Sequence, residues 1–236
     1  RLRKKTATDG ESAVTRYEYN NRNQQTAMVR ALSENHRWEY DYDEASRLKE
    51  VRDPEGNTTV YDYDRSDNRV LITDARTNPT NFEFDALNRL KTIQHPDGRT
   101  DRYEYDKEGN RTAWIRGDNQ RIERDYDGLN RVRVERYLPP STDGLTQVNS
   151  DYDGNGNLTR VEQQFTPDIK VWTATYDDFD RRRVVVDRNG VEVTQDYDLN
   201  HNRTERTGPE GVTHYGFNAL NQLTTLTPPA ATGPLS

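Results

Sequence analysis

Apolar and polar residues alternate along most of this chain with the two-residue period of a β-strand. In NTTVYDYD (residues 57–64), Thr59, Tyr61 and Tyr63 fall on one side of an extended backbone, and the residues between them fall on the other. RTDRYEYD (residues 99–106) has the same arrangement. The 3.6-residue period of an amphipathic helix is absent, so the pattern predicts strands of about six to eight residues.

The strand pattern recurs as a repeat anchored on an aromatic residue that is followed by Asp or Asn. Successive anchors are 20 to 26 residues apart, and six of the ten copies carry a second aromatic residue two positions earlier. The anchors are Tyr19, Tyr42, Tyr63, Phe84, Tyr105, Tyr126, Tyr152, Tyr176, Tyr197 and Phe217. A fixed period of this length is typical of repeat architectures. We expect these ten side chains to be the structural rungs of the fold.

Each repeat also contains two turn signals. One follows the anchor directly, and the other lies fourteen residues after it, where Gly56, Gly98, Gly190 and Gly211 occur. Glycine accepts a positive φ, and neighbouring Pro and Asp favour the first corner of a tight turn. The order strand, turn, strand, turn predicts an all-β fold of repetitive antiparallel β-hairpins. The array is predicted over residues 14–226, with flanking segments at residues 1–13 and 227–236.

The repeats are of two kinds that alternate along the chain. Starting from the anchor, one kind reads FDALNRL or YDGLNRV, and the other reads YDKEGNRT or YDGNGNLT. A pair of hairpins, about 42 residues long, is therefore the predicted repeating unit. A sheet of so many strands is expected to curve, because large twisted sheets curl unless they are covered.

Composition alone would favour disorder. Leu, Ile, Val and Phe make up 41 of 236 residues, which is below the fraction at which most chains bury enough apolar surface to fold. Two observations oppose disorder: the 34 basic and 41 acidic residues nearly cancel, and the 14 tyrosines are regularly placed. The aromatic repeat is therefore expected to replace a conventional apolar core.

The stretch DYDGNGNLTRVE (residues 151–162) matches the spacing of an EF-hand calcium loop. Asp151, Asp153 and Asn155 occupy the first, third and fifth positions, Gly156 the sixth and Glu162 the twelfth. An EF-hand needs flanking helices, however, and the flanking sequence alternates like strands. We interpret the stretch as one copy of the repeat turn.

Charged residues also follow the repeat. The residue before the anchor is acidic in eight copies, and most copies have an arginine after the turn. The acidic residues are Glu18, Asp41, Asp62, Glu83, Glu104, Asp125, Asp151 and Asp196, and the arginines are Arg47, Arg69, Arg89, Arg111, Arg131, Arg181 and Arg203. We hypothesise that the two rows form ion pairs across each hairpin, which would set the register and keep the surface soluble.

Little else in the chain indicates chemistry. There is no cysteine, and the four histidines lack metal-ligand spacing. No catalytic residue, cofactor or metal is predicted. The net charge of −7 argues against nucleic acid as a partner, and no apolar run is long enough for a membrane span. Trp38, Trp114 and Trp172 fit packing better than a sugar-stacking platform.

The Y-x-Y-D motif, with xxGNRT or xLNRL after it and DPxG-like turns between copies, resembles the YD repeat. That repeat occurs in bacterial Rhs proteins, in the shell components of Tc toxin complexes and in teneurins. The resemblance covers about residues 14 to 226. It implies hairpins that spiral into a hollow shell, which in the bacterial relatives holds a toxic domain. The relatives' aspartate protease motif is not matched, because Asn57 follows Asp53-Pro54-Glu55-Gly56.

The expected function is therefore that of a non-enzymatic structural segment of a β-shell that encloses and helps deliver a cargo domain of the same protein. Delivery by a bacterial secretion system, and contact with secretion proteins, follow from the resemblance. The alternative is an adhesion module whose aromatic-rich sheet binds glycans or a cell surface.

Overall fold

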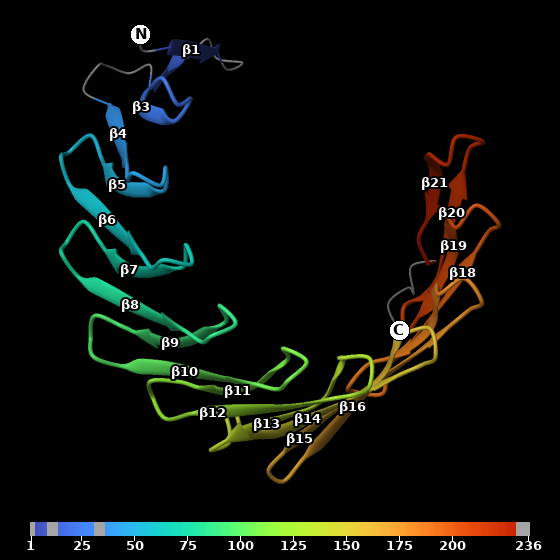
Figure 1. Ribbon diagram of the computed structural model, residues 1–236. Coiled ribbons are helices and arrows are strands. Elements are labelled where there is room, and N and C mark those ends of the chain that lie inside the picture. Colours follow the sequence, from blue (N-terminus) through green and yellow to red (C-terminus); the bar gives the residue numbers. More distant parts are fainter. Residues whose placement is uncertain (1–2, 9–13, 31–35, 230–236) are drawn as a thin grey trace, which may run out of the picture. The chain divides into compact units, whose positions relative to one another are not determined.

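The structure, a computed structural model, describes residues 3–8, 14–30 and 36–229. Every regular element in these ranges is a β-strand, and within the described ranges a short turn joins each strand to the next (Figure 1). The predicted all-β fold of antiparallel hairpins is confirmed. Because the described residues contain no helix, none of them belongs to a helix that could cross a membrane.

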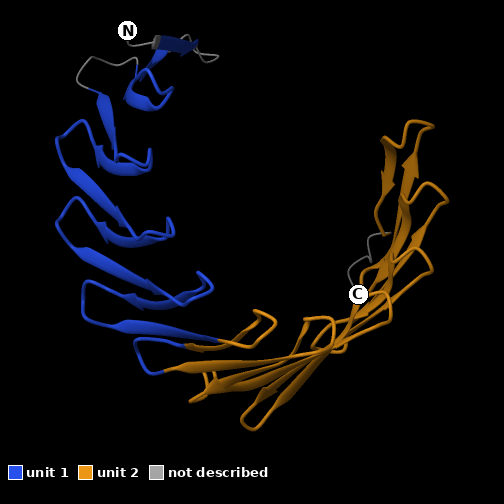
Figure 2. Cartoon of the chain, in the orientation of Figure 1, with its two compact units in different colours: residues 1–104, 115–119 blue, residues 105–114, 120–236 orange. Residues whose placement is uncertain are grey.

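The chain forms two compact units (Figure 2). Unit 1 covers residues 1–104 and 115–119, and unit 2 covers residues 105–114 and 120–236. Within unit 1, each strand pairs antiparallel with the strand that follows it. Its strands are β1 (Arg3–Thr8), β2 (Val14–Tyr19), β3 (Gln25–Val29), β4 (Arg37–Tyr42), β5 (Leu48–Arg52), β6 (Thr58–Tyr63), β7 (Arg69–Thr73), β8 (Pro79–Phe84), β9 (Leu90–Gln94) and most of β10 (Thr100–Tyr105).

In unit 2, from β12 (Arg121–Tyr126) to β21 (Leu223–Thr227), each strand likewise pairs antiparallel with the strand that follows it. Its strands are most of β11 (Arg111–Ile115), β12 (Arg121–Tyr126), β13 (Val132–Leu138), β14 (Leu145–Tyr152), β15 (Leu158–Phe165), β16 (Ile169–Tyr176), β17 (Arg182–Val186), β18 (Glu192–Tyr197), β19 (Arg203–Gly208), β20 (Gly211–Phe217) and β21 (Leu223–Thr227). Strands β14 to β16 have eight residues each. They are longer because this hairpin group carries the insertions that lengthen the repeat near residues 137–148 and 163–172.

One five-residue turn joins most of the strands. The backbone N–H of its first residue donates to the carbonyl of the fifth, and the N–H of the fourth donates to the carbonyl of the first, as in residues 53–57 and 64–68. The fourth residue has a positive φ, which is 87° at Gly56 and 65° at Asp67. This is a type I turn with a bulge, and it shifts the register by one residue at most anchors, as between Asp62 and Tyr63.

The four glycines expected in turns all have positive φ, with values of 87° at Gly56, 84° at Gly98, 80° at Gly190 and 108° at Gly211. The first three are the fourth residue of the five-residue turn. Gly211 instead pairs with Gly208 across a tighter connection between β19 and β20. Positive φ is disfavoured for residues that have a Cβ. The Asn, Asp, Ser, Thr and His residues at this position of the other turns nevertheless adopt it, with φ values of 58–69°.

An aspartate carboxylate supports most of these turns. In residues 127–131, one oxygen of Asp127 accepts hydrogen bonds from the backbone N–H groups of Leu129 (2.8 Å) and Arg131 (3.0 Å), and the other accepts from the Arg131 side chain (2.7 Å). The polar groups that a tight turn exposes are thereby satisfied locally. The aspartate that follows the anchor in the sequence motif is the residue that closes the turn.

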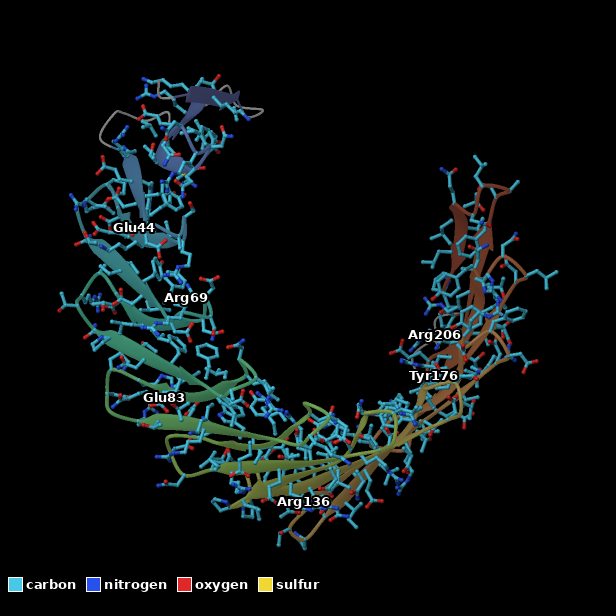
Figure 3. The ribbon with its side chains drawn as sticks, viewed as in Figure 1. Glu44, Arg69, Glu83, Arg136, Tyr176 and Arg206 are labelled. Carbon is cyan, nitrogen blue, oxygen red and sulfur yellow. The ribbon has the colours of Figure 1, made fainter. Side chains whose placement is uncertain are left out.

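The sheet in each unit is a single layer with very little core. Within the described residues, only Ala27, Val29, Ala113, Ile122 and Ala174 are buried apolar residues. Most other strand residues are half-buried, and side chains project from both sides of the strands (Figure 3). The backbone ladders, turns and side-chain contacts between neighbouring strands must therefore supply most of the stability.

The turn carboxylates predict acid sensitivity. The Arg131 backbone amide and side chain hold the pKa of Asp127 below its ordinary value, and the Asn68 side chain does the same for Asp64. A folded-state pKa below the unfolded value of about 3.9 contributes stability above that pH, and this contribution is lost as the pH falls through the folded pKa. We expect the thermal unfolding midpoint, followed by circular dichroism, to fall below about pH 4.

The Asp64→Asn variant, whose amide does not titrate in this range, should have a weaker pH dependence than the wild type. Glu55→Gln, in an exposed part of another turn, should keep the wild-type dependence. A midpoint that stays constant from neutral to strongly acidic pH would contradict this account of the turns.

Candidate functional site

Each anchor is the last residue of an even-numbered strand, from Tyr19 at the end of β2 to Phe217 at the end of β20. Six anchor hydroxyls donate a hydrogen bond of 2.8–3.0 Å to the backbone carbonyl of the first residue of the preceding odd-numbered strand. The pairs are Tyr42 with Gln25, Tyr63 with Leu48, Tyr126 with Arg111, Tyr152 with Val132, Tyr176 with Leu158 and Tyr197 with Arg182. Each bond joins one hairpin to the next, and the phenolic oxygen, rather than the ring alone, explains the preference for tyrosine.

The turns that follow the anchors are of two kinds, and the first is the arginine-type turn (residues 43–47, 85–89, 127–131 and 177–181). Its fifth residue is an arginine whose Nε donates to the turn aspartate at 2.7 Å, as Arg47 does to Asp43. Arg47 also donates to the carbonyl of Asp64 (2.9 Å) and lies 4.7 Å from the centre of the Tyr63 ring. Arg131 and Arg181 make equivalent contacts with the following repeat.

The second kind is the asparagine-type turn (residues 64–68, 106–110, 153–157 and 198–202). Its fifth residue is an asparagine whose Nδ2 donates both to its own turn aspartate and to the fourth residue of the turn that follows the next anchor. The contacts with the next turn are Asn68 to Asn88 (2.9 Å), Asn110 to Asn130 (2.9 Å), Asn157 to Asp180 (2.7 Å) and Asn202 to Asn221 (3.0 Å). The two kinds of repeat seen in the sequence therefore differ in the side chain, arginine or asparagine, that connects each turn to the following repeat.

For four of the seven arginines, the structure corrects the hypothesis that the arginines after the turns pair with the acidic residues before the anchors. Arg47, Arg89, Arg131 and Arg181 pair with the aspartate after the anchor instead, because the tight turn brings its first and fifth residues together. Acidic residues before the anchor pair with arginines of nearby strands, as Glu18 does with Arg37 (3.0 Å), Asp151 with Arg133 (3.3 Å), Asp125 with Arg136 and Asp196 with Arg183.

Glu18 is the most buried of these carboxylates, with 7% of its surface exposed. Lys4, Arg16 and Arg37 all lie within 3.5 Å of it. The Arg37 side chain holds the pKa of Glu18 below its ordinary value, and burial opposes this shift. The carboxylate thus joins β1, β2 and β4 electrostatically, which is a structural role.

The calcium-like stretch is a hairpin turn between β14 and β15. One oxygen of Asp153 accepts from the backbone amides of Asn155 and Asn157, and the other accepts from the Asn157 side chain (3.0 Å). Asp151 and Glu162 pair with Arg160. The oxygens that would bind a cation are engaged with protein donors, and no group of three or more His, Asp or Glu residues within residues 3–8, 14–30 and 36–229 has the arrangement of a metal site.

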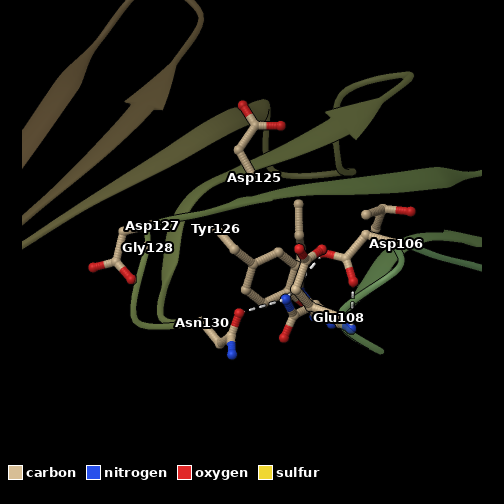
Figure 4. A pocket seen from close by; sticks show the side chains of 10 residues that line it. Asp106, Glu108, Asp125, Tyr126, Asp127, Gly128 and Asn130 are labelled. Carbon is tan, nitrogen blue, oxygen red and sulfur yellow. Dashed lines mark hydrogen bonds between the residues drawn. The ribbon is translucent and has the colours of Figure 1, made fainter.

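A shallow hollow of about 420 Å³ lies in unit 2 between Tyr126 and the turn of Asp106, with Glu108 and Asn130 at its rim (Figure 4). A similar hollow of about 310 Å³ lies in unit 1 between Tyr42 and Tyr63. Asp106 accepts from Asn110, and Asp127 accepts from Arg131. Because the hollows recur between successive anchors and their turn carboxylates are engaged, we attribute them to the spacing of the repeats.

Sequence reasoning missed one feature of the arginine-type turns. Their third residue is apolar and largely exposed, with exposed fractions of 69% at Leu87, 68% at Leu129 and 62% at Phe179. The turn directs this side chain outward. The type I turn explains this exposure, because the third residue of the turn lies at the tip of the hairpin.

These repeats match the model of a known protein family. The model described as RHS Repeat matches residues 36–79, 84–121 and 176–213, which together make up just over half of the chain. The chain belongs to the RHS repeat family. The matched segments begin close to the anchors or just before them, so the RHS repeat corresponds to pairs of the hairpins described above. Among curated proteins, no match was found.

Solved structures share the fold of these RHS repeats. A crystal structure of TcdB2-TccC3 covers 91% of this chain at 12% identity, with a TM-score of 0.64. A crystal structure of TcdB2-TccC3 without its hypervariable C-terminal region covers 97% at 11% identity (TM-score 0.54), and a Photorhabdus luminescens Tc holotoxin pore covers 90% at 13% identity (TM-score 0.53). The chain spans 14%, 14% and 11% of the lengths of those chains. The likeness at this identity is one of fold.

The hydroxyl bonds of the RHS anchors predict opposite effects for two substitutions. Tyr63→Phe removes the bond to Leu48 and should lower the free energy of unfolding by about 0.5–1.5 kcal/mol. Phe84→Tyr places a hydroxyl where the equivalent acceptor is the carbonyl of Arg69, the first residue of β7, and should raise stability by a comparable amount. Urea denaturation of the two variants and the wild type measures both effects. If the two variants shift stability in the same direction, the hydroxyl is not the source of the tyrosine preference.

Proposed function

We propose that this RHS repeat array is a wall segment of a larger protein shell that encloses a cargo domain of the same polypeptide. The proposal rests on one observation above the others: in each unit the repeats form a single-layer sheet that is held together along its own plane. Such a sheet needs no second layer to be stable, so its two faces are available to bound a compartment.

The in-plane contacts support this role. The tyrosine hydroxyls, the turn arginines and the turn asparagines all join a hairpin to its neighbour, and each unit gains stability as hairpins are added, as in other repeat proteins. A globular domain would instead depend on apolar residues packed between layers. The chain has few such residues, which suits a thin wall.

The two faces of the sheet differ in chemistry. The aromatic anchors share one face with Val51 and Ile72 in unit 1, while Asp41, Asp62 and Glu83 alternate to the other. Arg69 and Glu83 lie on opposite sides of the sheet in Figure 3. A wall with one half-apolar and one charged face can contact a client on one side and water on the other.

The structural role is also proposed to be non-enzymatic. The carboxylates of the turns accept backbone amides and arginine side chains, which fits support of the fold rather than acid–base chemistry. The anchor tyrosines donate their hydroxyls within the sheet, and Arg47, Arg131 and Arg181 cover the neighbouring rings. We therefore favour the shell over the glycan-binding alternative. Release of the shell outside the producing cell is part of the proposal and is supported by the fold shared with Tc toxin structures.

Limited proteolysis of the polypeptide that contains this array tests the proposal. If the array bounds a compartment, a non-repeat domain of that polypeptide should resist protease while the wall is intact. The double variant Asp106→Ala and Asp127→Ala, which removes two adjacent turn carboxylates, should expose that domain to cleavage at concentrations of protease that leave the wild type intact.

Glu108→Gln is the matched control, because Glu108 lies in one of the same two turns and is not the carboxylate that closes it. It should leave protection unchanged. Rapid cleavage of the domain in the wild type, under conditions in which the array itself stays folded by circular dichroism, would refute enclosure.

A further inference from the structure

The chain contains two Asn-Gly pairs, Asn155-Gly156 and Asn189-Gly190. Both occupy the third and fourth positions of the five-residue turn, and both glycines have positive φ, 95° and 80°. In both turns the glycine N–H donates to the carbonyl of the first residue, at 3.1 Å for Gly156 and 2.9 Å for Gly190. The pairs thus share the Asn-Gly dipeptide and the turn backbone, and they differ in the fifth residue of the turn and in what surrounds it.

The turn of Asn155 is held by several side chains. The Asn155 Nδ2 donates to Asp180 (2.9 Å), and Asn157 donates both to Asp180 (2.7 Å) and to the second oxygen of Asp153 (3.0 Å). Arg131 lies 3.6 Å from the position of a Cβ on Gly156 and donates to the Asp153 carbonyl at 3.4 Å. Neighbouring turns on both sides therefore restrain this one.

The turn of Asn189 lacks these restraints. Its fifth residue is Val191, which has no side-chain donor for the second oxygen of Asp187, so Asp187 is bonded only to the backbone amides of Asn189 (2.8 Å) and Val191 (2.9 Å). Across the part of the chain that the structure describes, the Asn189 side chain makes no hydrogen bond. A Cβ on Gly190 would have nothing within 4 Å, so the turn has open space around it.

We propose that Asn189 is a site of spontaneous deamidation and that Asn155 is protected from it. When the turn opens, the Gly190 backbone nitrogen loses its proton and attacks the Asn189 Cγ. A nitrogen–carbon bond forms, the bond from Cγ to Nδ2 breaks, and ammonia leaves with the proton. Water then opens the resulting five-membered succinimide at either carbonyl, which gives aspartate or isoaspartate.

The difference between the two sites comes from the opening step. The nucleophilic nitrogen is occupied by a turn hydrogen bond in both, so the reaction draws on the open population. The turn of Asn155 loses at least two more side-chain hydrogen bonds on opening, which corresponds to roughly a tenfold smaller open fraction. Modification at Asn189 places a new negative charge, and in the isoaspartate form an extra backbone carbon, at the tip of the β17–β18 hairpin.

Incubation of the purified chain in mildly alkaline buffer, followed by peptide mapping with mass spectrometry, tests the proposal. The peptide with Asn189 should gain the mass of an amide-to-acid exchange about ten times faster than the peptide with Asn155, and electron-transfer fragmentation should identify isoaspartate. In concentrated denaturant the two rates of deamidation should become similar, because the turn hydrogen bonds and the side-chain hydrogen bonds around Asn155 are then absent. Asn189→Gln should abolish the change in its peptide.

Two further variants test the cause. Val191→Asn introduces the donor that Asn57 and Asn78 supply to Asp53 and Asp74 in equivalent turns, and it should slow the reaction at Asn189. Asp180→Gly, which tolerates the φ of 58° at that position, removes the acceptor and should speed the reaction at Asn155. Equal rates at the two sites in the folded wild type, or no effect of either variant, would overturn the proposal.

Discussion

The structure depends on the Asp or Asn that follows each anchor, because its side-chain oxygen accepts backbone amides of its own turn. A hairpin with a bulged type I turn needs a residue at positive φ and leaves several N–H groups without strand partners. The Asp or Asn side chain satisfies those groups from within the turn, so the register at the end of each even-numbered strand is set before any contact between hairpins forms. Every other repeated contact, including the tyrosine bonds, relies on that register.

Fixed turns allow polar groups to do what an apolar core does in most domains. Each tyrosine hydroxyl reaches a carbonyl at a strand start, and each turn arginine or asparagine reaches the next turn. Single contacts of this kind contribute little, since an intramolecular hydrogen bond adds only about 0.5–1.5 kcal/mol. They are repeated along the array, however, and this explains how a chain with so little buried apolar surface forms extended sheets.

The sequence predicted the strands, the two rows of turns and the alternation of two repeat types, because each is encoded within a few adjacent residues. The β-strand alternation around Tyr61 and Tyr63 and the glycine at position 56 are such local signals. The partner of Arg47 was predicted wrongly, since the charge pattern offers two acidic neighbours and only the turn geometry selects Asp43. The acceptor of the Tyr63 hydroxyl is a backbone atom of another hairpin, which side-chain patterns do not report. The division into two compact units and the outward direction of Leu129 likewise depend on conformation rather than on residue type.

The alternation of arginine-type and asparagine-type turns has a consequence for how genes of this kind can change in length. An asparagine such as Asn68 needs a side-chain oxygen at the fourth position of the next turn, which Asn88 provides and which a glycine such as Gly109 would not. Duplication or loss of one hairpin would set two turns of the same kind side by side and leave such donors without acceptors. Unequal recombination should therefore be tolerated most readily in steps of two hairpins, so that these arrays are expected to evolve by paired modules rather than by single ones.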